Sequence, residues 1–178
     1  MMIITKPIPN FLLETIEVMA KAAEIGGKSH IRTGEDRLEK LSQDQIVGQV
    51  ADAAFHVYLH GHGLEWKRKR WYQNHFPRVG DGGSDVPPSN IDVKGSLRRG
   101  TLPFEAYRLA VRPPELHENW VYVLAIVEED FKFCHFLGWA STSMLPIDVE
   151  QAGTFAGAYV LPAVKLYPLP PIVWNWAR

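Results

Sequence analysis

Three charged residues lie close together in one short segment, and their types suit metal-assisted chemistry. Asp85 precedes Asp92 by seven positions, and Lys94 follows Asp92 by two. Carboxylate oxygens are the ligands that Mg²⁺ and Mn²⁺ prefer in proteins. The segment therefore predicts a divalent-metal site with an ammonium group beside it.

A strand is the element that would position these side chains. In a strand at residues 91–94, Asp92 and Lys94 share one face because side chains alternate, while Ile91 and Val93 bury the other. If Asp85 lies on a paired neighbouring strand, its carboxylate can meet that of Asp92. A surface strand with a plain salt bridge between Asp92 and Lys94 is the alternative explanation of the same triplet.

This arrangement resembles the PD-(D/E)xK nuclease superfamily, in which an acidic residue is followed, after a short gap, by a (D/E)-x-K triplet. The matching residues are Asp85, Asp92 and Lys94, and the similarity spans residues 42–145. It implies an α/β fold with a restriction-endonuclease-like core, in which helices flank a central mixed β-sheet. It also implies a Mg²⁺-dependent (or Mn²⁺-dependent) deoxyribonuclease that leaves a 5′ phosphate and a 3′ hydroxyl.

In that resemblance, Asp85, Asp92 and the carbonyl of Val93 would hold the metal, and Lys94 would orient or help to deprotonate the attacking water. Members commonly carry Glu or Gln on the helix before the sheet, and Gln49 is the matching position. At about 100° per residue, Gln49 lies roughly 60° from Ile46, at the rim of the predicted apolar stripe.

Two departures from the family pattern stand out. Ser84 replaces the usual Pro before the first Asp. Gln49 stands where many members have Glu, and a neutral amide is a weaker metal ligand than a carboxylate. Whether Gln49 supports a second metal is therefore left open.

The length of 178 residues predicts one domain over residues 1–178, and the resemblance implies a nuclease-like core at 42–145. A helix begins at a capping box of Ser42 and Gln45 and ends at Gly61. The segment 1–41 carries a predicted helix at 10–24, and a Pro-rich tail covers 146–178. Strands are predicted at 91–94, 107–112, 121–127 and 131–140, a short helix opens at 147–152, and 159–176 is predicted to be extended.

The middle of the chain is basic although the formal net charge is only −1. Residues 61–112 carry ten Lys or Arg against five Asp or Glu. The candidate nucleic-acid-binding residues are Lys67, Arg68, Lys69, Arg70, Arg98 and Arg99. DNA is thus the expected partner, although a solvated basic face is an equally good explanation of the run 67–70 alone.

Composition excludes several classes of protein. A hydrophobic content of 46% is enough for a packed core and argues against intrinsic disorder. The longest apolar run, residues 121–127, is far shorter than the roughly 20 residues that span a bilayer, so no membrane association is expected. With one cysteine, Cys134, no intrachain disulfide can form, and a cytoplasmic location is expected. A homodimer is left open.

Two other functions remain alternatives to the nuclease. One is a noncatalytic nucleic-acid-binding module of the same fold, which the neutral Gln49 motivates. The other is a small interaction protein in which the Asp92 and Lys94 pair is only structural. A zinc site at His56, His60 and His62 is disfavoured because no Cys pair or HExxH motif accompanies these histidines.

Overall fold

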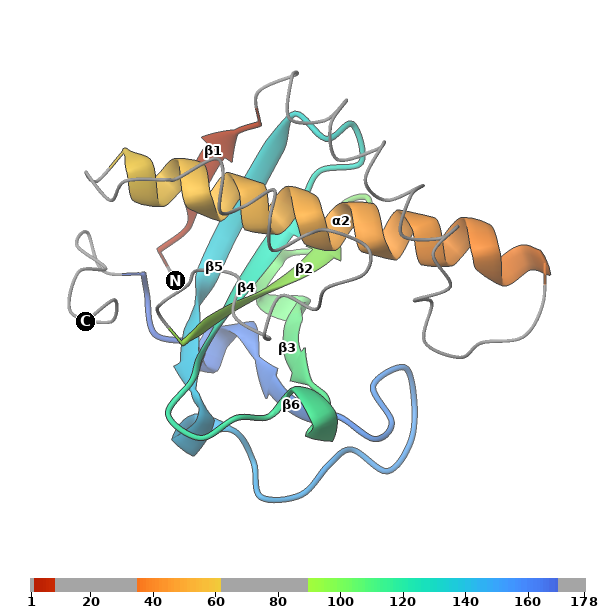
Figure 1. The fold of residues 1–178 in the computed structure, drawn as a ribbon, viewed down its shortest axis with the longest axis vertical. Helices are drawn as coiled ribbons and strands as arrows, with labels where there is room; N and C mark the ends of the chain where they lie inside the picture. The colour runs from red at the N-terminus through yellow and green to blue at the C-terminus, as the bar shows by residue number, and fades with distance from the viewer. Residues whose placement is uncertain (1, 9–34, 62–89, 170–178) are drawn as a thin grey trace.

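The computed structural model describes residues 2–8, 35–61 and 90–169 (Figure 1). In these ranges the chain forms a four-stranded sheet, a two-stranded sheet and one long helix. The elements are β1 (Ile4–Pro7), α2 (Glu35–His60), β2 (Ile91–Leu97), β3 (Arg108–Val111), β4 (Val121–Val127), β5 (Phe133–Ser141) and β6 (Tyr159–Pro162). Single turns of 3₁₀ helix lie at η1 (Phe104–Ala106), η2 (Pro113–Glu115), η3 (Thr142–Met144) and η4 (Ala163–Lys165).

The larger sheet is mixed, and its strand order is β1-β5-β4-β2. β2 runs parallel to β4, whereas β5 is antiparallel to both β4 and β1. β4 is an unbroken apolar run in which residues 122–127 are buried, as expected for a strand covered on both faces. The strands predicted at 91–94, 107–112, 121–127 and 131–140 are all confirmed, and the α/β class is confirmed with them.

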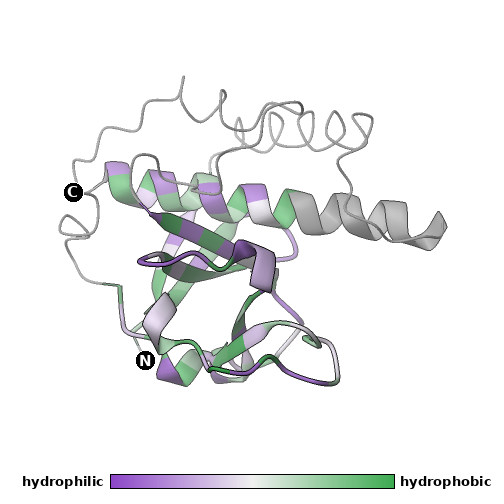
Figure 2. Cartoon of the chain, turned by 60° about the horizontal axis from the view of Figure 1, so that its bottom comes forward, coloured by the Kyte–Doolittle hydropathy of each residue, from purple (hydrophilic) through white to green (hydrophobic). Residues whose placement is uncertain are grey.

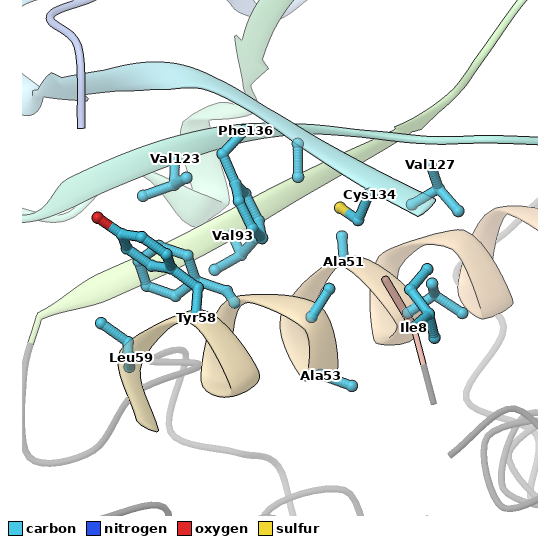
Figure 3. Packing of buried hydrophobic residues seen from close by; sticks show 14 of the residues in the cluster. Ile8, Ala51, Ala53, Tyr58, Leu59, Val93, Val123, Val127, Cys134 and Phe136 are labelled. Atoms are coloured by element: carbon cyan, nitrogen blue, oxygen red, sulfur yellow. The ribbon is translucent and has the colours of Figure 1, made fainter. Parts of the chain in front are cut away.

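One face of this sheet packs against α2. Ile91 and Val93 of β2 contribute to a core cluster that includes Phe55 and Tyr58 of α2, and also Cys134 of β5 (Figure 3). Cys134 is fully buried there and is therefore a core residue. Because side chains alternate along a strand, Asp92 and Lys94 are directed to the opposite face of β2.

The opposite face of the sheet is covered by the pair β3 and β6, which run antiparallel to each other. Leu109 and Leu161 from this pair pack with Tyr122 and Leu124 of β4 in a second core cluster. The described part of the chain is therefore layered, with α2 on one side of the mixed sheet and the two-stranded sheet on the other (Figure 1).

Close approach of α2 to the sheet depends on a glycine in β2. A Cβ atom added at Gly95 would lie 2.8 Å from the carbonyl oxygen of Val47, 3.0 Å from the Cβ of Ala51 and 3.2 Å from the Cα of Gly48. No ordinary side chain fits at such distances. Val47, Gly48 and Ala51 therefore mark the side of the helix that touches β2.

Several sequence-based expectations are wrong in detail. α2 begins at Glu35 and not at the capping box of Ser42, because the intervening residues are mostly good helix formers. The short helix predicted at 147–152 is absent. There the amide of Gly157 donates to the Glu150 carbonyl and the amide of Glu150 donates to Ala158, which closes a loop instead. The predicted helix at 10–24 lies outside the described residues.

Two short strands were not predicted. β1 adds to the edge of the mixed sheet beside β5, and β6 opens the segment that was expected to be only extended. Both are four residues long and end at a proline, so neither offers enough alternation to be recognised. No helix in the described ranges is long and apolar enough to cross a membrane.

Candidate functional site

Asp92 and Lys94 form a direct ion pair on the face of β2 that points away from α2. The Lys94 Nζ lies 2.8 Å from the Asp92 Oδ2. Asp92 is 8% exposed, which is unusual for a carboxylate and shows that the strand holds it against the body of the protein. The prediction that these two side chains share one face is confirmed.

A second carboxylate, which the sequence did not reveal, completes the arrangement. Glu115 in η2 places its Oε2 2.9 Å from the same Lys94 nitrogen and accepts a 3.4 Å hydrogen bond from the amide of Arg112. Its side chain is 44% exposed, so this side of the site is open to solvent. In the sequence, Pro113-Pro114 predicts a turn just before Glu115. Nothing in the sequence predicts that this turn contacts Lys94.

The opposite charges of Lys94 and its two carboxylate partners stabilise each other in their ionised forms. Burial lowers the pKa of Lys94, but the carboxylates of Asp92 and Glu115 outweigh this effect and raise the pKa above its ordinary value. Burial raises the pKa of Glu115, but the ammonium of Lys94 dominates and leaves that pKa below its ordinary value. Lys94 is thus held as a cation and Glu115 as an anion at neutral pH.

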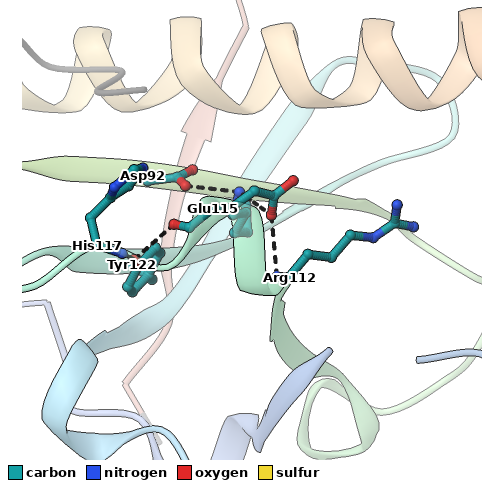
Figure 4. A network of polar contacts seen from close by, with 6 residues as sticks. Asp92, Arg112, Glu115, His117 and Tyr122 are labelled. Atoms are coloured by element: carbon teal, nitrogen blue, oxygen red, sulfur yellow. Dashed lines mark hydrogen bonds and ion pairs between the residues drawn. The ribbon is translucent and has the colours of Figure 1, made fainter. Parts of the chain in front are cut away.

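Tyr122 ties η2 to the sheet directly beneath this ion network (Figure 4). Its hydroxyl donates to the carbonyl oxygen of Glu115 at 3.0 Å and accepts from the amide of His117 at 2.9 Å. Tyr122 lies opposite Asp92 in the register of β4 and β2. Burial raises the pKa of the Tyr122 phenol, so this group remains a hydrogen-bond donor. The position of Glu115 over Lys94 is therefore set by a buried residue of the core strand.

The structure does not bring Gln49 to this pair. Val47 and Ala51 touch β2, and Gln49 lies about 160° around the helix from each of them. The described turns of α2 carry both apolar and polar residues (Figure 2), so polarity alone does not mark the side that faces the sheet. Gln49 is half-buried, and its Oε1 accepts no hydrogen bond in the part of the chain that the structure describes.

The backbone of Val93 has a defined direction. Val121 N donates to the carbonyl of Asn90, and Arg98 N donates to the carbonyl of Val127, so even-numbered residues at both ends of β2 bond to β4. The regular alternation of a parallel ladder then turns the Val93 carbonyl toward the edge of β2 away from β4. This carbonyl and the Asp92 side chain thus belong to consecutive residues of the outermost strand in the described sheet.

The other predicted residues divide into two groups. Asp85 and the basic run Lys67, Arg68, Lys69 and Arg70 lie outside the described residues. Arg98 and Arg99 follow β2 directly. The Arg98 guanidinium stacks 3.9 Å from the centroid of the Phe104 ring, whereas Arg99 is exposed and its amide donates to the hydroxyl of Tyr107. Arg99 is the more accessible of the two for a phosphate.

The donor set suits a hard divalent cation. Asp92 and Glu115 both contact one ammonium nitrogen, so their carboxylates lie within about 6 Å of each other. Oxygen ligands of this kind fit Mg²⁺ or Mn²⁺. The described ranges contain no group of three or more His, Cys, Asp and Glu side chains that could hold a metal, so a further ligand such as Asp85 would be required.

Comparisons of the chain with protein families, curated proteins and solved structures find no match.

Proposed function

We propose that the protein is a metal-dependent nuclease that hydrolyses DNA phosphodiester bonds at Asp92 and Lys94. The observation that carries the proposal is the pairing of a buried Asp92 with Lys94 on one face of an outer strand, with Glu115 open to solvent beside them. A restriction-endonuclease-like core is part of this proposal, and it is supported by the mixed sheet with a helix packed on one face.

In this proposal Asp85, Asp92 and the Val93 carbonyl would hold Mg²⁺. When bound, the ion would neutralise charge on the phosphate and supply an activated water. Asp92 is already in place for this role because β2 fixes it against the core.

Lys94 orients the attacking water and stabilises developing negative charge. Its raised pKa makes Lys94 a poor general base while both carboxylates are ionised. A general base must be unprotonated near neutral pH in order to accept a proton, and Lys94 is protonated there. Glu115 holds the Lys94 ammonium over the strand. The basic residues 67–70 together with Arg98 and Arg99 would contact the phosphate backbone.

The test is incubation of the purified protein with linear duplex, circular duplex and single-stranded DNA in Mg²⁺, Mn²⁺ or EDTA. We expect cleavage of at least one substrate with metal and none with EDTA. Lys94→Ala should abolish cleavage while the far-UV circular dichroism spectrum stays unchanged. Wild-type rates in that variant would reject the assignment of Lys94.

A noncatalytic nucleic-acid-binding module is the second candidate, and the ion network itself favours it. Lys94 is already neutralised by two carboxylates, as in a purely structural cluster. Calorimetric titration with Mn²⁺ separates the two candidates. Heat of binding that disappears in Asp92→Asn supports the nuclease, whereas tight DNA binding without any Mn²⁺ heat supports the module.

A further inference from the structure

Two aromatic rings lie on the connection between η2 and β4. The centroids of the His117 and Trp120 rings are 4.3 Å apart, with an angle of 41° between the ring planes. His117 is exposed, whereas Trp120 is half-buried and packs against the core cluster between the two sheets. The result is an exposed ring supported from behind by a larger one.

The backbone under these rings is firmly fixed. The Thr142 hydroxyl donates to the His117 carbonyl at 2.6 Å, and the Thr142 amide donates to the Trp120 carbonyl at 3.0 Å. Asn119, between the two rings, has a φ of 60°, a left-handed conformation that Asn tolerates better than most residues. A surface held in this way needs little ordering when a ligand binds, which favours affinity.

The rings adjoin the ion network of Asp92 and Lys94. The His117 amide donates to the Tyr122 hydroxyl, which in turn donates to the carbonyl of Glu115. In the view of Figure 4, the His117 side chain extends from its loop in the direction of Asp92, and Arg112 lies on the other side of Glu115. The exposed His117 ring therefore lies near the loop that carries Glu115, and the exposed Arg112 lies beyond Glu115.

This combination suits a nucleotide whose base is not paired. An aromatic ring stacks on the flat face of a base, and that face is accessible only where the base has left a duplex stack. The exposed Arg112 can contact the phosphate of the same strand. In a regular duplex the base faces are covered by their neighbours, so a duplex would make only phosphate contacts at this site and no stacking contact.

We propose that His117, backed by Trp120, is a stacking platform for an unpaired base next to Asp92, and that the protein acts on single-stranded or frayed DNA. This inference rests on the proposed nuclease function, because it names the substrate class for the same site. His117 acts here through its ring face, and its charge is not required.

The test is fluorescence anisotropy in EDTA, where cleavage does not interfere, with a labelled 12-mer as a single strand and as a blunt duplex. Wild type should bind the single strand more tightly. His117→Ala should weaken single-strand binding by about fivefold or more, as expected for the loss of one stacked base. His117→Phe keeps a ring and should retain most of the affinity.

Phe133→Ala is the matched control, because Phe133 is also an exposed aromatic residue. Phe133 is the first residue of β5, whereas Tyr122, which lies below the ion network, pairs with Ala140 near the other end of that strand. This variant should bind as wild type does. If wild type cleaves DNA with metal but His117→Ala binds the single strand as tightly as wild type does, the platform is refuted and the nuclease proposal stands. If wild type neither binds nor cleaves any DNA, both proposals fail.

Discussion

Replacing Lys94 with Met tests the energetic reasoning behind the site most sharply. Met is similar in length to Lys but carries no charge, so Lys94→Met keeps the side-chain packing and removes the ammonium. The Asp92 and Glu115 carboxylates, which both contact Nζ in the wild-type protein, would then face each other without their shared cation. The loss should appear as reduced stability as well as lost activity.

The exposure of the pair sets the size of the effect. The side chains of Lys94 and Asp92 are 22% and 11% exposed, so the pair lies between a surface salt bridge and a fully buried one. Surface pairs contribute about 1 kcal/mol at most, and removing one partner of a buried pair costs roughly 3–5 kcal/mol. We therefore expect Lys94→Met to lower the free energy of unfolding by about 1–3 kcal/mol.

The assay is urea denaturation at pH 7 of four proteins: wild type, Lys94→Met, Asp92→Asn and the double variant. Because the two groups contact each other directly, the double variant should lose less stability than the sum of the single variants. We expect a coupling of about 1 kcal/mol, which exceeds the roughly 0.5 kcal/mol scatter seen for independent sites. Additive effects within that scatter would show that the ion pair contributes nothing, and would refute this reasoning.

Three further predictions concern the fold and the charges around the site. Gly95→Ala should destabilise the protein by about 1–3 kcal/mol in urea melts because its Cβ would collide with the backbone of α2, whereas Gly48→Ala, whose Cβ has open space, should be neutral or slightly stabilising. Cys134 should resist iodoacetamide until the protein unfolds, since burial raises the pKa of its thiol; labelling of the native protein at the rate of a free thiol would contradict this. Because Lys94 lowers the pKa of Glu115, the stability advantage of wild type over Glu115→Gln should be constant above pH 4.5 and shrink as the pH falls through the lower folded value; an advantage that grows on acidification would contradict the pairing.

The strands of the site were predictable because their patterns are local. The unbroken apolar run of β4 and the alternation of Ile91, Asp92, Val93 and Lys94 each arise within a few residues, so the periodicity rules apply directly. The shared face of Asp92 and Lys94 follows from the same alternation.

Glu115 could not be predicted, because its role comes from tertiary contact. It lies 21 positions from Lys94 in the sequence, and no motif connects them. The Tyr122 hydroxyl donates a hydrogen bond to the Glu115 carbonyl, and this bond holds η2 next to β2. Such a contact becomes apparent only when the sheet has been assembled.

The orientation of α2 was misjudged for a different reason. Residues on opposite sides of this helix are buried, since Ala51 faces β2 while Asp52 and Ala53 are also less than 3% exposed. A helix buried on several sides has no single apolar stripe, so periodicity does not define which side faces the sheet. For that reason, the predicted position of Gln49 at the rim of an apolar stripe does not place Gln49 near Asp92.

The most direct test of the central claim is the rate at which Asp92→Asn cleaves a labelled single-stranded oligonucleotide in Mn²⁺, compared with wild type and with Asp130→Asn. Asp130 is an exposed carboxylate paired with Lys132, so it provides the same chemical change away from the site. We predict metal-dependent cleavage by wild type and Asp130→Asn, and a loss of about 100-fold or more in Asp92→Asn. Equal rates in all three proteins would contradict the claim that Asp92 and Lys94 form a nuclease site, and so would a wild type that cleaves neither duplex nor single-stranded DNA in Mn²⁺ or Mg²⁺.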